Sequence, residues 1–103
     1  MAESRGALTE AAYYILLSLF EVRHGYSIMQ LVEQISAGRV TLGAGTLYGA
    51  LSTLVERGLI REVAAYDRKK EYLITDAGKA AVRTEMHRLA ELLDNGRKIA
   101  GEL

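Results

Sequence analysis

LGAGTLYGALSTLVERGLIREVAAYDRKKEYLIT, residues 42–75, is the stretch of sequence that decides the fold. Its first half carries leucines at helical spacing and closes on Gly58, a residue type that favours the left-handed end of a helix. Its second half contains two runs rich in β-branched and aromatic residues, at 59–66 and 70–75. We therefore predict a helix over about residues 44–57, followed by a β-hairpin.

This predicted helix has two unlike faces. The face expected to turn inward carries Leu47, Leu51, Leu54 and Val55. The opposite face is small or polar and carries Gly45, Thr46, Tyr48, Gly49 and Ser52. Glycine inside a helix costs about 1 kcal/mol relative to alanine, so the two glycines need a reason. Close approach of another molecule to this face would explain both glycines.

Two shorter helices are expected before this stretch. Thr9 is a suitable N-cap for the first helix, and the break at His24-Gly25 separates it from the second, which ends near Gly38. The second helix is expected to bury Ile28, Leu31, Val32 and Ile35. A short strand is expected at residues 40–42, in the link to the third helix.

The first helix is apolar on more than one side. One stripe consists of Leu8, Ala12, Ile15, Leu16 and Leu19, and a second consists of Tyr13, Leu17 and Phe20. A domain of 103 residues can hardly cover both stripes by itself, so we expect the second stripe to meet another subunit. Coverage of both stripes by later helices of the same chain is the alternative.

A long last helix is predicted from Thr75-Asp76 to about Ala100. An apolar seam runs along it, formed by Val82, Met86, Leu89 and Leu93 and widened by Leu92 and Ile99. Because this helix follows a complete set of core elements, its seam needs a partner to bury it.

The order of the predicted elements is helix, helix, short link, helix, hairpin and long helix, which is the plan of a winged helix-turn-helix. We expect a mainly α fold with a small β-hairpin. Residues 7–75 would form a winged helix-turn-helix DNA-binding domain, and residues 76–100 a C-terminal dimerisation helix.

The small, polar helix face suits DNA. The major groove is about 12 Å wide and admits one helix, and glycines let the helix backbone approach closely. Thr46, Tyr48 and Ser52 can reach phosphates or base edges from this face. A run of solvated turn charge is the alternative explanation for Arg68, Lys69 and Lys70, but beside such a helix they are expected to neutralise phosphates.

Charge is unevenly distributed although the net charge is zero. Residues 57–70 hold five basic and two acidic residues, and the rest of the chain is slightly negative. The overall charge does not indicate a nucleic-acid-binding protein, but this local basic segment permits one.

Several motifs together closely resemble the PadR family of bacterial transcriptional regulators. They are HGY at 24–26, LGAGTLYGAL at 42–51, GLI at 58–60 and RKKEYLIT at 68–75 with Gly78. The resemblance covers about residues 7–93, and the absence of a multi-helix C-terminal domain is typical of the short branch of the family. Ala44 stands where the family usually has proline, so we expect a slightly looser helix start with no change of function.

The resemblance implies a homodimer and a repressor that releases DNA when a ligand binds or conditions change, the expected ligand being a small hydrophobic or aromatic effector. The last helix would pair across the two-fold axis and pack with the partner's first helix, through Tyr13, Leu17, Phe20, Val82, Met86, Leu89, Leu92 and Leu93. A near-palindromic double-stranded operator would touch Tyr26, Ser27, Gly45, Thr46, Tyr48, Gly49, Ser52, Arg68, Lys69 and Lys70. Of these, Tyr26 and Ser27 are assigned to the phosphate backbone by the resemblance alone.

Other classes of function are disfavoured. The chain has no cysteine and only two histidines, so neither thiol chemistry nor a metal site is expected, and no cofactor is implied. No nucleophile, acid–base pair or phosphate loop indicates an enzyme. No signal peptide or membrane span is apparent, so a cytoplasmic protein is expected. The competing hypothesis is a winged-helix module that binds proteins and not DNA.

Overall fold

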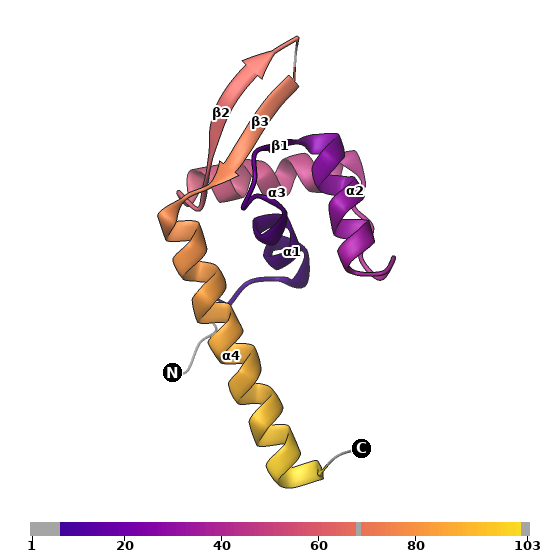
Figure 1. Ribbon diagram of the computed structural model, residues 1–103, viewed down its shortest axis with the longest axis vertical. Coiled ribbons are helices and arrows are strands. Elements are labelled where there is room, and N and C mark those ends of the chain that lie inside the picture. The colour runs from indigo at the N-terminus through magenta and orange to yellow at the C-terminus, as the bar shows by residue number, and fades with distance from the viewer. Residues whose placement is uncertain (1–6, 68, 102–103) are drawn as a thin grey trace.

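The computed structural model describes residues 7–67 and 69–101. Its elements in chain order are α1 (Glu10–Ser18), β1 (Arg23–His24), α2 (Gly25–Ile35), α3 (Ala44–Glu56), β2 (Ile60–Tyr66), β3 (Lys69–Ile74) and α4 (Asp76–Ala100). Helices α1 to α3 form the body, the β2–β3 hairpin projects from one end of it, and α4 extends away in the opposite direction (Figure 1). This arrangement is the predicted winged helix-turn-helix with a long C-terminal helix.

Local capping explains where the helices begin. The Thr9 hydroxyl accepts a hydrogen bond from the Ala12 backbone N–H, and the Thr75 hydroxyl accepts one from Gly78 N–H, each at 3.0 Å. Imidazole takes this role at α2, where His24 Nδ1 accepts from the Ser27 N–H at 3.4 Å. Each of these side chains satisfies one of the N–H groups that a helix start leaves unpaired. The caps predicted at Thr9 and Thr75 are confirmed.

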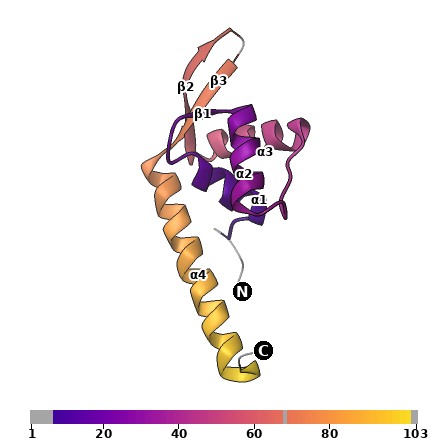
Figure 2. The ribbon, with the colours of Figure 1, turned by 45° about the vertical axis from the view of Figure 1, so that its right-hand side comes forward.

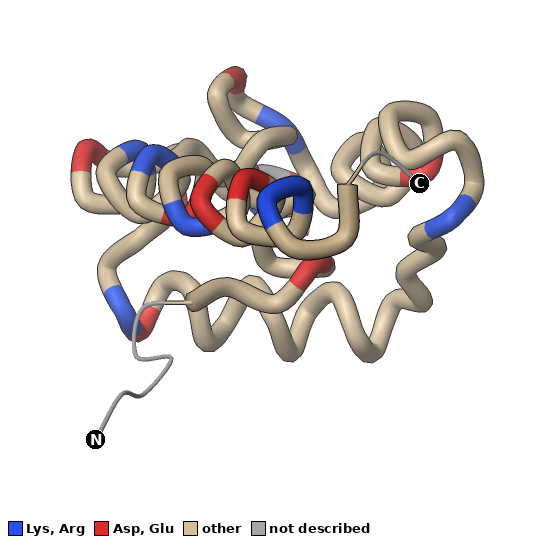
Figure 3. The backbone as a smooth tube through the Cα atoms, turned by 90° about the horizontal axis from the view of Figure 1, so that it is seen from below, with Lys and Arg blue, Asp and Glu red and all other residues tan. Residues whose placement is uncertain are grey.

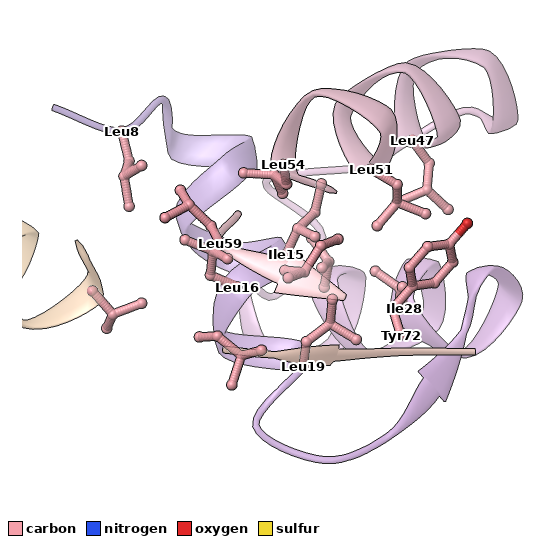
Figure 4. Packing of buried hydrophobic residues seen from close by; sticks show 14 residues of the cluster. Leu8, Ile15, Leu16, Leu19, Ile28, Leu47, Leu51, Leu54, Leu59 and Tyr72 are labelled. Carbon is pink, nitrogen blue, oxygen red and sulfur yellow. The ribbon is translucent and has the colours of Figure 1, made fainter. Parts of the chain in front are cut away.

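The core consists of leucine, isoleucine and valine side chains from every helix, closed by the base of the hairpin. Its fully buried members include Ile15, Leu16, Leu19, Ile28, Val32, Leu47, Leu51 and Ile60. Figure 4 shows the Tyr72 ring of β3 beside the leucines of α3, with its hydroxyl directed outward. The leucine face of α3 and the first stripe of α1, except the partly buried Ala12, are therefore buried as predicted.

Two apolar side chains predicted to face inward are exposed instead. Ile35 is 46% exposed and Val55 is 42% exposed. Ile35 is the last residue of α2, beyond the buried Val32. Val55 follows the buried Leu54, and one step along a helix rotates a side chain by about 100°, which turns it toward the hairpin. Both predictions were wrong, because Ile35 lies at the end of α2 and Val55 faces the hollow beside the hairpin.

The sheet has three antiparallel strands in the order β1-β3-β2. Its short edge strand, β1, pairs Arg23 with Tyr72 and His24 with Glu71. The strand predicted at residues 40–42 is absent, so that prediction was wrong. The Val40 N–H donates instead to the Ser36 hydroxyl at 3.0 Å, which anchors the link to the end of α2 without a strand partner.

The joint between the hairpin and α4 is a single residue, Thr75, and it is tightly bonded. The Thr75 N–H donates to the Leu59 carbonyl at 3.0 Å, and its hydroxyl donates to the Gly58 carbonyl at 2.7 Å. Next to this joint, the Ile74 N–H donates to the Leu19 carbonyl at 2.9 Å. Gly58 has φ of 76°, the left-handed conformation predicted for it. Helix α4 is thus fixed directly to the body.

Only the first turns of α4 pack on the body, and the remainder extends past the other helices (Figure 2). Gly78, Val82 and Glu85 are buried, whereas all residues from Leu89 to Ala100 are exposed. Val82, assigned above to the dimer seam, is 3% exposed and belongs to the core of the chain itself. The uncovered part of the seam therefore begins at Met86.

Gly78 sits where α4 crosses the start of the hairpin, and alanine there is expected to destabilise the fold. A Cβ at this position would lie 2.6 Å from Ile74 Cγ1 and closer still to the Leu59 carbonyl oxygen. Because part of the obstruction is backbone, relief requires α4 to move. We expect Gly78→Ala to lower the free energy of unfolding by at least about 2 kcal/mol in urea titrations.

Gly49→Ala is the matched control for Gly78→Ala. It also lies inside a helix, but a Cβ there would meet nothing within 4 Å. It should leave the free energy of unfolding unchanged or raise it by about 1 kcal/mol, because alanine favours the helix. Equal behaviour of the two variants would contradict the close packing at Gly78.

Candidate nucleic-acid interface

Helix α3 presents a solvent-exposed face without formal charge. No lysine, arginine, aspartate or glutamate lies between Arg39 and Glu56, and Figure 3 shows α3 in tan as far as its C-terminal end. The predicted contact residues Gly45, Thr46, Tyr48, Gly49 and Ser52 are all exposed. The face therefore offers hydroxyl donors, apolar atoms and accessible backbone, and any cationic contribution must come from neighbouring elements.

A hollow of about 430 Å³ separates α3 from the hairpin. It is lined by Tyr48, Ser52, Val55, Glu62, Lys70 and Tyr72. Burial raises the pKa of Tyr72 above its ordinary value, and the neighbouring Glu62 and Tyr48 raise it further, so the phenol stays neutral. In this hollow, the ammonium group of Lys70 lies near the hydroxyl-bearing face of α3.

A second hollow, of about 280 Å³, lies between the hairpin and the start of α2. It is lined by His24, Gly25, Tyr26, Tyr48, Lys69 and Lys70. Tyr48 and Lys70 line both hollows, so the two hollows adjoin at these side chains. Of the predicted contact residues, the two hollows bring together Tyr26, Tyr48, Ser52, Lys69 and Lys70. Ser27, Gly45, Thr46 and Gly49 line neither of them. Arg68 lies outside the described residues.

Ser27 is held by an arginine that the sequence did not single out. Arg23 donates from Nε to the Ser18 carbonyl at 2.9 Å, from Nη1 to Ser27 Oγ at 3.0 Å and from Nη2 to Glu21 Oε1 at 3.2 Å. The Ser27 oxygen accepts from Arg23, which leaves the hydroxyl proton to donate elsewhere. Tyr26, beside it, is 63% exposed.

The sequence of the chain matches the model of a known protein family. The model described as the transcriptional regulator PadR-like family matches residues 15–84. The chain belongs to the PadR-like family. The proteins of this family are transcriptional regulators and not enzymes.

Solved structures of other proteins share the fold of this PadR-like chain. RosR of H. salinarum is 27% identical and superposes with a TM-score of 0.66, over 98% of this chain and 84% of RosR. A complex structure of RosR designated RosR-S1 gives the same identity and TM-score. A transcriptional regulator from Clostridium thermocellum shares the fold with a TM-score of 0.74 at 19% identity, over 93% and 95% of the two chains.

One relative is much longer than this PadR-like chain. An uncharacterised 37.1 kDa protein in transposon Tn4556 of Streptomyces fradiae is 39% identical over 69 residues. The match includes 67% of this chain and 19% of that protein. The chain therefore spans about a fifth of the length of this relative.

The described residues of this PadR-like chain contain neither a membrane-spanning helix nor a cluster of metal-binding side chains. None of the described helices is long and apolar enough to cross a membrane. Within the same residues, histidine, aspartate and glutamate form no group of three or more that could hold a metal ion.

The PadR-like chain carries an uncovered apolar surface away from α3. We call this surface the α4 seam; it consists of Met86, Leu89, Leu92 and Leu93, all exposed. On α1, the second stripe is only partly covered by the chain itself, because Tyr13 and Leu17 are half-buried and Phe20 is exposed. The Lys79 ammonium lies 5.8 Å from the centre of the Phe20 ring.

A buried carboxylate of this PadR-like protein joins α4 to the segment before α1. Glu85 is 3% exposed, and its Oε1 accepts from the Leu8 N–H at 3.1 Å and from Arg88 Nε at 3.1 Å. Arg88 Nη2 also pairs with Glu85 Oε2. The hydrogen bond from Arg88, supported by the Leu8 N–H and the Arg88 charge, lowers the pKa of Glu85 below its ordinary value of 4.5, against the opposing effect of burial.

The lowered pKa of Glu85 predicts how stability depends on pH in this PadR-like fold. A carboxyl group whose pKa is lower in the folded state stabilises the fold above its unfolded pKa, and this contribution is lost as the pH falls through the folded pKa. We expect wild type to be more stable than Glu85→Gln at pH 7, with the difference shrinking below pH 4.5. Urea titrations of both proteins across this range measure the difference, and a constant difference would contradict the assignment.

Proposed function

We propose that the chain is a sequence-specific DNA-binding repressor that acts as a homodimer. Residues 7–75 are the DNA-binding unit, and residues 76–100 provide the dimer contact. The observation that carries the proposal is the exposed, uncharged face of α3 beside two hollows that share Lys70. Such a face fits a major groove, while the lysines lie where phosphates would flank it.

The division of charge suggests a division of roles. Lys69 and Lys70 supply sequence-independent attraction to phosphates, which is the salt-dependent part of binding. Thr46, Tyr48 and Ser52 supply hydroxyl and apolar contacts to bases, and the small Gly45 and Gly49 let the helix sit deep in the groove. Tyr26 and Ser27 at the start of α2 hydrogen-bond to the backbone of the same half-site.

The α4 seam supports the homodimer. Four large apolar side chains on one helix face form a patch of the kind that monomeric proteins rarely expose. A second copy of the chain offers the same seam, together with the half-covered α1 stripe of Tyr13, Leu17 and Phe20. Two-fold pairing makes the operator a near-palindrome with half-sites about one helical turn, or about 34–36 Å, apart.

The test of this function is a fluorescence-anisotropy titration of the protein against DNA from upstream of its own gene. We expect binding to a near-palindromic site that is at least about 1,000-fold tighter than binding to random duplex in the same salt. Footprinting then locates the two half-sites. Equal affinity for both duplexes, or no binding at low salt, would favour the protein-binding module over the repressor.

A hollow next to the α4 seam supports ligand control of the repressor. It has a volume of about 340 Å³ and is lined by Leu8, Glu10, Tyr13, Tyr14, Arg39, Glu85, Arg88 and Leu89. The rings of Tyr13 and Tyr14 meet edge to face at 6.2 Å, and the ion pairs Arg39–Glu10 and Arg88–Glu85 form the charged part of the lining. A small aromatic or hydrophobic effector fits this lining.

Ligand control can be tested with the aromatic probe 8-anilinonaphthalene-1-sulfonate. The probe should gain fluorescence on binding and release operator DNA at the same concentrations, and Tyr14→Ala should weaken both effects in parallel. Probe binding that leaves DNA affinity unchanged would separate this hollow from regulation.

A further inference from the structure

Gly25, the first residue of α2, lies directly against the side chain of Tyr48 in α3. A Cβ built on Gly25 would lie 2.8 Å from Tyr48 Cζ, 3.3 Å from Cε1 and closer still to the hydroxyl oxygen. The atoms that would be displaced all belong to the far end of one side chain. Alanine at position 25 therefore moves the Tyr48 ring and leaves the backbones in place.

The backbone at Gly25 cannot easily move, because hydrogen bonds hold the residues before and after it. It follows β1, which pairs with Tyr72 and Glu71 of the hairpin. Arg23 is tied to the Ser18 carbonyl and the Ser27 hydroxyl, and His24 caps α2. Tyr48, by contrast, is 50% exposed and has an open hollow on either side of its ring.

Resting on the proposed function, we infer that Gly25 is a positioning residue for operator recognition. The absence of a side chain at Gly25 creates a notch that seats the Tyr48 hydroxyl end and holds the ring between the hairpin lysines and the α3 face. The notch fixes where Tyr48 meets the duplex and has no contact of its own with DNA bases. Without it, Tyr48 rotates, and discrimination between operator and random sequence falls.

A double-mutant cycle tests the inference, using Gly25→Ala, Tyr48→Ala and the combination. Each single variant is expected to weaken operator binding by about tenfold. In the Tyr48→Ala background, Gly25→Ala should change operator affinity by less than about twofold, because nothing is left to displace. Random-sequence affinity and the salt slope should stay close to wild type for Gly25→Ala, since no phosphate contact is removed.

The same three variants are unfolded in urea, which separates folding from recognition. Alanine suits the first helical turn, so Gly25→Ala should not destabilise the Tyr48→Ala protein. The proposal is overturned if Gly25→Ala leaves operator affinity intact in wild type, or weakens it equally in both backgrounds. If wild type itself binds no DNA, the repressor function fails, and non-additivity in urea still decides whether Gly25 seats Tyr48.

Discussion

Replacing Leu89 and Leu93 with aspartate should convert the proposed dimer into a monomer. Both side chains lie on the exposed α4 seam, and a symmetric pair of helices would bury four of them, two from each copy. Losing about 1 kcal/mol for each half-buried leucine weakens pairing by about 4 kcal/mol, which is about 1,000-fold in dissociation constant. Burying carboxylates in their place adds a further penalty.

Sedimentation velocity measures this change directly, and operator affinity should fall with it, because a monomer holds one half-site only. The matched control is Thr84→Asp with Asn95→Asp, which adds two carboxylates to other faces of the same helix, both exposed. The control should remain dimeric. A Leu89→Asp/Leu93→Asp protein that still sediments as a dimer would rule out the seam as the interface.

Replacing Lys69 and Lys70 with alanine should weaken DNA binding irrespective of sequence. Each lysine that neutralises a phosphate contributes about 0.9 to the slope of log affinity against log salt concentration, so a dimer that loses four contacts loses up to about 3.6. At 0.1 M salt we expect affinity for operator and for random DNA to fall together, by at least about 100-fold. The ratio of the two affinities should change little.

Anisotropy titrations at several salt concentrations provide the slope. Lys98→Ala is the control, because Lys98 lies near the far end of α4 and pairs with Asp94 at 3.2 Å. It should leave the slope unaltered. An unchanged slope in the Lys69→Ala/Lys70→Ala protein would mean that the hairpin does not touch phosphates.

The fold was predictable wherever local chemistry decides structure. Thr9 and Thr75 cap helices, Gly58 ends one in the left-handed conformation, and the leucines of α3 occupy the core. All of these signals are contained within a few neighbouring residues. They were sufficient for the order of the helices and for the hairpin.

Features that depend on contacts between distant segments could not be predicted. Strand β1 has two residues and therefore no periodicity, and it exists because β3 offers an edge almost fifty residues later. Glu85 resembles any surface carboxylate in the sequence, yet the N–H of Leu8 and Arg88 make its burial possible. The same is true of Gly25, whose importance depends on where the Tyr48 ring lies.

On the surface of α3, the sequence predicted which residues are exposed but not how they are grouped. Gly45, Thr46 and Ser52 were identified from helical spacing, and the structure exposes them. Tyr48 and Lys70 border two adjoining hollows because of the angle between α3 and the hairpin. The spacing of residues in the sequence does not determine this angle. Arg23 escaped notice because its partners are mainly main-chain and hydroxyl oxygens of neighbouring turns.

The single-residue joint at Thr75 has a mechanical consequence for a repressor built in this way. The end of the hairpin, the Thr75 joint and α4 are connected by hydrogen bonds. Each subunit would therefore rotate as one rigid body about the paired α4 helices. A slight change in the angle at which two such helices cross would be magnified at the tips of the hairpins. The molecule would then leave its operator by altering its span, with every surface that touches the duplex kept intact.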